Sequence, residues 1–303
     1  MERFRDNKIK FYVGFSLAGL FFIIASLYTS FSCPPNFPIG STFVVNENES
    51  LKTISNRLEE RNIVSSALMF RALVSFTGRD RHVQLGVYEL PEKLSLREVV
   101  KRFTTMGPNH PLVKVTIPEG STVKETIDVF LEAIPALSEE KLTTIIEQEN
   151  ADGKLFPSTY FLLPSATEEK VVKLLLDTFQ SMYQNSFAFL IKPKNVTTDN
   201  DIISLAAILE GEAKTVEDMQ IISGILQKRL AIKMPLQVDV AKETYKSRGL
   251  PGVPINNPGK NAIHAVFNPI ETPYLYYITG KDGTMYYAKT YDEHKRNINK
   301  YLR

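Results

Sequence analysis

The longest apolar run of the chain lies near its amino terminus. No charged residue occurs from Phe11 to Phe31, and this span is about as long as the roughly 20 residues with which a helix crosses a bilayer. We therefore predict a transmembrane helix over residues 11–32. A cleaved signal peptide is the alternative, but the apolar region is longer than usual for one and no small-x-small cleavage pattern follows it.

Charges on either side of this run predict its orientation. Basic residues outnumber acidic ones in residues 1–10, and the next charged residue after the run is Glu47. Because positive charge is retained on the cytoplasmic side of a membrane, residues 1–10 should be cytoplasmic and the rest of the chain should lie outside the cytoplasm. The single cysteine, Cys33, follows Ser30, Phe31 and Ser32, which fit a lipoprotein signal poorly.

Residues 40–106 alternate between strand-like and helix-like patterns. A short β-like run is followed by a helix with Leu51, Ile54 and Leu58 on one face, and by a second helix over residues 66–74. A strand over residues 83–90 and a helix opened by a Ser95–Glu98 capping box come next. The predicted order is strand, helix, helix, strand, helix.

An apolar helix beginning near Asp201 ends in two acidic residues, Glu210 and Glu212. Two positions correspond to about 200° around a helix, so the two carboxyl groups cannot both enter one site. A glutamate held against apolar neighbours has a raised pKa and can act as a proton donor near neutral pH. The helix therefore predicts one general acid, with the other glutamate exposed or structural.

Loops rich in Pro, Gly and Asn follow this helix and predict an ordered cover for an acid/base site. Farther on, aromatic-rich segments flank residues 280–283 and predict a β-hairpin. Thr290 and Glu293 predict the cap of a last helix, which carries His294.

Composition mainly excludes functions. The 303 residues carry a formal net charge of +2 and no run of basic residues interleaved with aromatics, which argues against nucleic-acid binding. One cysteine cannot form an internal disulfide, and the four histidines do not have metal-site spacing. We therefore expect no structural metal and no cofactor.

Several motifs occur in the order found in the MltG/YceG-like family of endolytic peptidoglycan transglycosylases, and the chain resembles that family most specifically from Leu205 onward. The motifs are Ala206-Ala207-Ile208-Leu209-Glu210-Gly211-Glu212, Met234-Pro235-Leu236-Gln237, Gly249-Leu250-Pro251 and Asn257-Pro258-Gly259. The resemblance implies an α+β fold with a LysM-like module at residues 40–106. A YceG-like region would follow at residues 107–303, with a catalytic core at 196–303.

The resemblance also implies residue roles. Glu212 matches the family's catalytic glutamate, and Glu210, Gln237, Asp239, Tyr245 and Asn257 match positions that line or support the substrate cleft. From the residues alone, Gln237 and Asp239 fit sugar binding or loop support equally well. Asn257 fits either a cap for the helix near Lys260 or a substrate contact.

The implied activity is cleavage of nascent peptidoglycan strands between N-acetylmuramic acid and N-acetylglucosamine, leaving 1,6-anhydro ends. The implied location is the bacterial inner membrane, with a single span and the catalytic part outside the cytoplasm. Besides peptidoglycan strands and the membrane, the resemblance implies cell-wall synthases of the elongation or division machinery as partners.

The chain departs from the family pattern after Asp239, where a segment of the cleft wall is shortened. This departure leaves two alternatives open. The first is a non-catalytic glycan-binding or scaffold protein of the same fold. The second is a hydrolase that uses two carboxylates, such as Glu212 and Asp239, and produces reducing ends.

Overall fold

The computed structural model describes residues 31–47, 49–78 and 83–302. The chain divides into two compact units between Val113 and Lys114, which are treated separately below. Within the described ranges, no helix is both long and apolar enough to span a bilayer. The predicted span at residues 11–32 falls almost entirely outside those ranges.

The first unit has the order of elements that its sequence pattern predicts. Strand β1 (Ser41–Val45) and strand β2 (Gly86–Leu90) form an antiparallel pair, with Phe43 opposite Tyr88. Helices α2 (Leu51–Glu60) and α3 (Ala67–Phe76) lie between the strands in sequence. Helix α4 (Leu96–Lys101) follows β2 and continues into a π-helical turn, η1 (Arg102–Met106). The Ser95–Glu98 capping box is confirmed.

Phe103 lies at the centre of this unit's core. Tyr88 stacks on its ring with centroids 4.1 Å apart, while Phe43 and Phe70 meet it edge to face. All four side chains are fully buried. Such a cluster draws one ring from each strand and from two helical segments, so it fixes how the helices pack on the strand pair.

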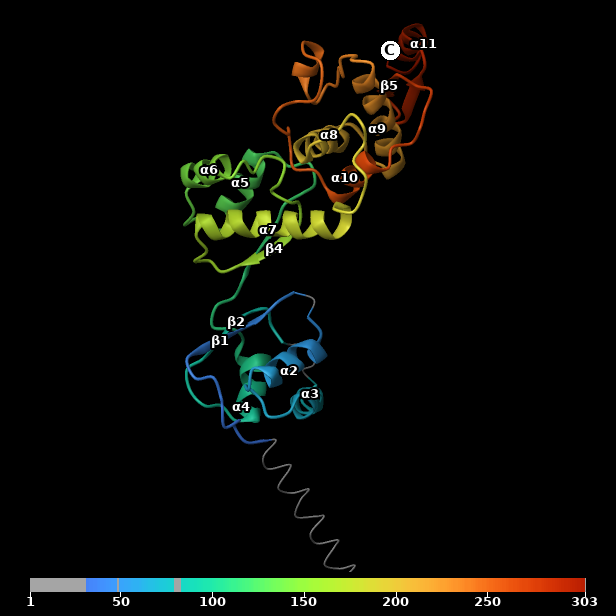
Figure 1. Ribbon diagram of the computed structural model, residues 1–303. Helices are drawn as coiled ribbons and strands as arrows, with labels where there is room; N and C mark the ends of the chain where they lie inside the picture. Colours follow the sequence, from blue (N-terminus) through green and yellow to red (C-terminus); the bar gives the residue numbers. More distant parts are fainter. Residues whose placement is uncertain (1–30, 48, 79–82, 303) are drawn as a thin grey trace, which may run out of the picture. The chain divides into compact units, whose positions relative to one another are not determined.

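The second unit begins with a small α/β layer. Strands β3 (Val113–Thr116) and β4 (Thr159–Leu162) pair with each other. Helices α5 (Val123–Ala133) and α6 (Glu139–Gln148) lie between them in sequence, and the long helix α7 (Glu168–Phe187) follows. In Figure 1, α7 extends from below α5 and α6 toward α10.

Helix α8 (Asp199–Glu212) forms the centre of the second unit. Its residues from Ile202 to Leu209 are all buried, and it packs against α9 (Val216–Ala231) and α10 (Lys260–Phe267). A capping box between Thr198 and Asp201 fixes its start. A helix buried on all sides cannot shift within the core, so it holds the glutamates at its end in fixed positions.

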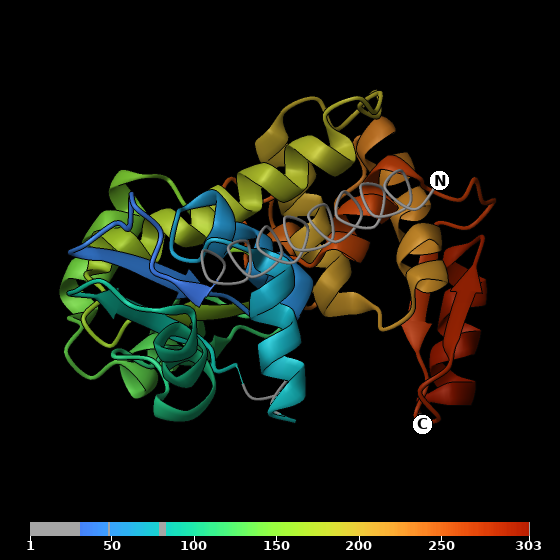
Figure 2. The same cartoon turned by 90° about the horizontal axis from the view of Figure 1, so that it is seen from below.

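A β-hairpin and a last helix complete the second unit. Strands β5 (Tyr276–Thr279) and β6 (Met285–Ala288) are antiparallel, as predicted, and α11 (Tyr291–Tyr301) packs against both. Figure 2 shows α11 beside the hairpin at the carboxyl end of the chain. A short 3-10 turn, η2 (Lys242–Tyr245), lies in the long connection between α9 and α10. The described residues thus form a mixed α+β protein.

Candidate active site

Four of the predicted site residues line one pocket of about 710 Å³ in the second unit. Glu212 lies at the end of α8, and Gln237, Asp239 and Tyr245 come from the connection that follows α9. The remaining walls come from α9, β5 and α11. Their lining residues are Arg229, Tyr276, Tyr277, Ile278, Thr279, Tyr291, His294, Ile298 and Leu302. Glu210 and Asn257 do not line this pocket.

Glu212 has the surroundings of a proton donor. Burial raises the pKa of its carboxyl group, and backbone hydrogen bonds near Val240 offset only part of that effect. The nearby charge of Asp239 raises the pKa further. Its Oε1 atom is buried, and no described residue forms a hydrogen bond with it. Glu212 thus lines the pocket and keeps one buried carboxyl oxygen without a protein partner.

Tyr277 is an aromatic neighbour of this carboxyl group in the same pocket. Its hydroxyl lies close enough to affect the pKa of Glu212, yet it makes no regular hydrogen bond within the described chain. Burial, together with the negative charge of Glu212, raises the pKa of Tyr277 well above its ordinary value. The phenol therefore stays protonated and can donate to the carboxylate or to a bound ligand.

Glu210 points to the other side of α8, as the helical spacing predicts. Its Oε2 accepts a hydrogen bond from the backbone N–H of Gly259 at 2.8 Å. Burial raises the pKa of Glu210, and the Gly259 N–H partly counters this. At Gly259 a Cβ atom would lie 2.1 Å from the exposed Glu119 carboxylate, so a larger residue there would require Glu119 to move. Glu210 thus connects α8 to the loop that begins α10.

Asn257, like Glu210, lies outside the Glu212 pocket and contacts other protein segments. It is fully buried, accepts a hydrogen bond from Leu155 N at 2.9 Å and donates to Ser121 O at 2.9 Å. The interpretation as a helix cap is wrong, because Gly259 is the N-cap of α10 and no side chain caps that helix. These hydrogen bonds of Asn257 connect protein segments, and its predicted substrate contact stays a prediction.

The shortened segment after Asp239 folds back on itself. The buried Thr244 hydroxyl accepts from Val238 N at 3.0 Å, and the Tyr245 hydroxyl donates to Asp239 Oδ1 at 2.8 Å. Gln237 begins this turn with a φ of 49°, in the left-handed region. The loop is therefore a compact wall that presents Asp239 and Tyr245 at the pocket, and Asp239 is already engaged.

The pocket also depends on Arg229, which sequence reasoning missed. Its buried guanidinium donates to Leu275 O at 2.7 Å and to Leu236 O, and it lies 5.2 Å from the centre of the Tyr276 ring. These contacts connect α9 to the Gln237 loop and to the chain just before β5. The only sequence signal was a basic residue on a helix otherwise assigned to the core.

Tyr276 and His294 form the opposite wall and were not predicted as site residues. Their rings stack with centroids 5.2 Å apart. Burial and the charge of Arg229 lower the pKa of His294, so the imidazole is neutral near pH 7. A neutral aromatic surface beside a carboxyl group is suited to the face of a sugar ring.

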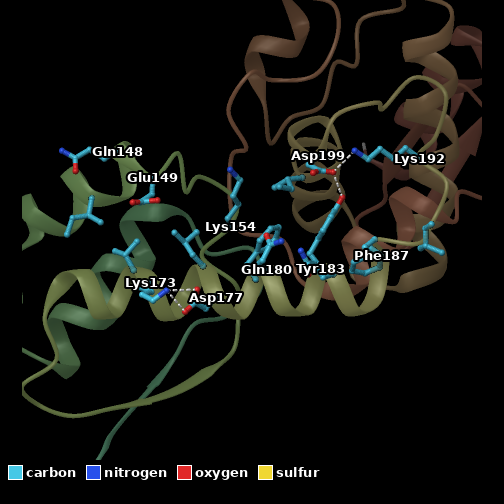
Figure 3. A pocket seen from close by; sticks show the side chains of 18 of the residues that line it. Gln148, Glu149, Lys154, Lys173, Asp177, Gln180, Tyr183, Phe187, Lys192 and Asp199 are labelled. Carbon is cyan, nitrogen blue, oxygen red and sulfur yellow. Dashed lines mark hydrogen bonds and ion pairs between the residues drawn. The ribbon is translucent and has the colours of Figure 1, made fainter.

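A larger pocket, of about 1110 Å³, lies along α6, α7 and the start of α8 and holds none of the predicted site residues (Figure 3). Both of its aspartates form ion pairs: Lys192 contacts Asp199 at 2.8 Å, and Lys173 contacts Asp177 at 3.2 Å. The Lys192 contact lowers the pKa of Asp199. A lowered pKa does not suit a proton donor, and the pKa of Glu212 is raised instead.

Among the described residues, no three His, Cys, Asp or Glu side chains form a group that could hold a metal ion. A comparison with family models decides the broader relationship. The model of the YceG-like family matches residues 43–242 and 243–300. The chain belongs to the YceG-like family. The match includes Glu212 and the residues of the pocket up to α11.

Curated relatives of this YceG-like chain include two proteins named endolytic murein transglycosylase. The protein of Streptococcus pneumoniae (strain ATCC BAA-255 / R6) is 26% identical over 322 residues, covering 85% of this chain and 57% of the relative. The protein of Bacillus subtilis (strain 168) is 25% identical over 314 residues, covering 88% and 84% respectively. The chain thus spans little more than half the length of the pneumococcal relative.

Among solved structures, the crystal structure of a YceG-like protein from Listeria monocytogenes is similar to this one. The TM-score is 0.51 at 20% identity, and the match covers 84% of this chain and 98% of the other. This similarity supports the mixed α+β fold and adds nothing on chemistry.

Proposed function

We propose that the chain is an endolytic lytic transglycosylase of peptidoglycan, with Glu212 as its general acid and base. The observation that carries the proposal is the Glu212 carboxyl group, which has a raised pKa and an unpartnered oxygen beside a pocket of polar and aromatic side chains. The names of the relatives from S. pneumoniae and B. subtilis support the same activity.

The reaction needs one carboxyl group acting twice. Protonated Glu212 gives its proton to the bridging oxygen as the bond from C1 of N-acetylmuramic acid breaks. The resulting carboxylate then takes the proton of the 6-hydroxyl, whose oxygen bonds to C1 and closes the 1,6-anhydro ring. Glu212 ends protonated, and no water is consumed.

The neighbouring groups have supporting roles in this proposal. The Tyr277 hydroxyl is placed to donate to the Glu212 carboxylate once its proton has left. Tyr276 and His294 offer a ring surface for a sugar, and Gln237 and Asp239 offer polar contacts at the pocket edge. Arg229 holds the walls together and does not face substrate as an acid or base.

We further propose that residues 11–32 anchor the chain in the bacterial inner membrane as a single span, with the described units outside the cytoplasm. The uncharged run and its flanking basic residues support this orientation. We assign residues 40–106 to a LysM-like glycan-binding module on the strand-helix-helix-strand order. Cell-wall synthases of the elongation or division machinery are the proposed protein partners.

Peptidoglycan strands incubated with the full-length protein and analysed by mass spectrometry test the activity. We expect 1,6-anhydro ends within strands, lost in Glu212→Gln and retained in Glu210→Gln. New reducing ends without the anhydro ring would instead establish hydrolysis, with Asp239 as the second carboxylate. Strand binding without cleavage by the unaltered protein would favour a glycan-binding scaffold.

A further inference from the structure

Helix α3 exposes an apolar face to solvent. Leu68, Ala72 and Phe76 are spaced four residues apart and so lie in a line along the helix, and all three are exposed. Leu68 keeps 63% of its surface accessible and Phe76 keeps 89%. We call this row the α3 stripe. Only one residue of the helix, Arg71, is charged, and it donates to Ser55 and to Asn56 of α2.

The neighbouring helix shows that this exposure is not a general property of the unit. Helix α2 has the same length and also buries one face, including Ile54 and Leu58. Its outward positions are polar, as expected for a helix facing water. They are Lys52, Thr53, Asn56, Glu59 and Glu60. The outer face of α2 is therefore polar, whereas the outer face of α3 is apolar. An apolar outer face is suited to an apolar medium.

The chain enters this unit directly from the long apolar run. Phe31, near the end of the predicted span, packs on the unit's core, as does Cys33. Ser65, two residues before α3, donates from its hydroxyl to Ser32 O at 3.3 Å. The start of α3 therefore lies at the point where the predicted membrane span ends, with no free linker between them.

We propose that the α3 stripe lies in the interfacial layer of the bilayer, on the outer side of the membrane that residues 11–32 cross. This inference rests on the membrane anchor given under the proposed function. A helix with one apolar face lies in the plane of the interface with that face among headgroups and upper acyl chains. The Ser32–Ser65 contact brings α3 within reach of that layer as soon as the span is inserted.

Two neighbouring contacts, the end of the span and the α3 stripe, would then hold the unit against the membrane. The span alone permits the unit to rotate about one point, whereas an embedded stripe fixes which face is turned to the lipid. The polar face of α2 would remain in water, and the first unit would stay close to the membrane surface.

Site-directed spin labelling of the full-length chain in phosphatidylethanolamine/phosphatidylglycerol vesicles tests this inference. In a Cys33→Ser background, single cysteines replace Ala72 in the stripe, Lys52 on the polar face of α2, or Ala25 in the predicted span. Relaxation by oxygen, which concentrates in lipid, is compared with relaxation by a water-soluble nickel complex. We expect the label at 72 to shift toward oxygen relative to the label at 52, and the label at 25 to be deepest.

The position-25 label separates failure of this inference from failure of the anchor. A lipid signal at 25 with an aqueous signal at 72 would overturn the α3 inference and leave the anchor in place. Shielding of 72 from both reagents would also overturn it, because protein and not lipid would then cover the stripe. An aqueous signal at 25, or protein that does not sediment with vesicles, would overturn both.

Discussion

The carboxyl groups of Glu210 and Glu212 lie on two sides of the end of α8 and have different surroundings. Glu210 faces the loop that begins α10, where the Gly259 N–H donates to its Oε2 at 2.8 Å. Glu212 faces a pocket of about 710 Å³ and keeps one buried oxygen without a partner. Burial raises the pKa of both carboxyl groups.

A raised pKa therefore does not identify the acid in this protein. The pKa of both glutamates is raised, but only Glu212 lines the pocket in which a ligand could accept its proton. Glu210 has its hydrogen-bond needs met inside the protein, whereas Glu212 can exchange a proton with a ligand in the pocket. We call the Glu210 side of α8, with Asn257, the closed side and the Glu212 side the open side. We expect the closed side to contribute to stability and the open side to contribute the chemistry.

The largest expected effect is on the rate. Replacing Glu212 by Gln removes the proton donor but keeps the shape of the side chain, so strand cleavage should fall by about 10²- to 10⁴-fold or more. Glu210→Gln is the matched control, with the same chemical change on the closed side. Initial rates of anhydro-product formation check this, and equal losses in the two variants would contradict the division.

A substitution on the closed side should lower the stability of the protein. Asn257→Ala leaves Leu155 N without its partner in a buried place, while Ser121 O keeps the bond from the Asn257 backbone N–H, so the free energy of unfolding should fall by about 1–3 kcal/mol. Asn200→Ala is the control, because Asn200 donates to Gly252 O from an exposed position and should cost less than about 1 kcal/mol. Urea denaturation followed by circular dichroism measures both, and similar losses would show that the buried network is not special.

The sequence predicts most of the helices and strands because the patterns that indicate them are local. Capping boxes and alternating strands depend on neighbours within about four residues, and the predicted order of the first unit matched the structure. The opposite directions of Glu210 and Glu212 also followed from helix geometry alone.

What sequence could not supply were contacts between distant positions. The partners of Asn257 lie 102 and 136 residues away, and Arg229 reaches Leu275 across 46 residues. Only tertiary packing decides that a loop asparagine is buried, or that a helix arginine joins two pocket walls. Four of the residues to which the family resemblance gave site roles line one pocket, whereas Asn257 does not, and the roles themselves stay predictions.

Glu212, on the open side, should also make the stability of the protein depend on pH. Because burial raises the pKa of Glu212 above its unfolded value, ionising this group costs folding free energy as pH rises from the unfolded pKa through the folded one. Glu212→Gln removes that cost, so the variant should gain stability relative to the unaltered protein at pH 7. The gain should shrink toward zero at about pH 4. Thermal denaturation at both pH values checks the sign, and a gain that grows toward acid pH would mean that the pKa is lowered instead.

The smallest expected effect concerns the short loop at the pocket edge. Tyr245→Phe removes the hydrogen bond to Asp239, and because the ring is about half exposed the loss of stability should be under about 1 kcal/mol. A freed Asp239 would loosen one wall of the pocket, so KM for glycan strands should rise by a few-fold while kcat stays nearly constant. Tyr291→Phe is a suitable control, since it changes another exposed phenol of the pocket that makes no contact with Asp239 in the described chain. A fall in kcat instead of a rise in KM would place Tyr245 beside the reacting bond, and the open side would then extend farther along the loop than Glu212 and Tyr277.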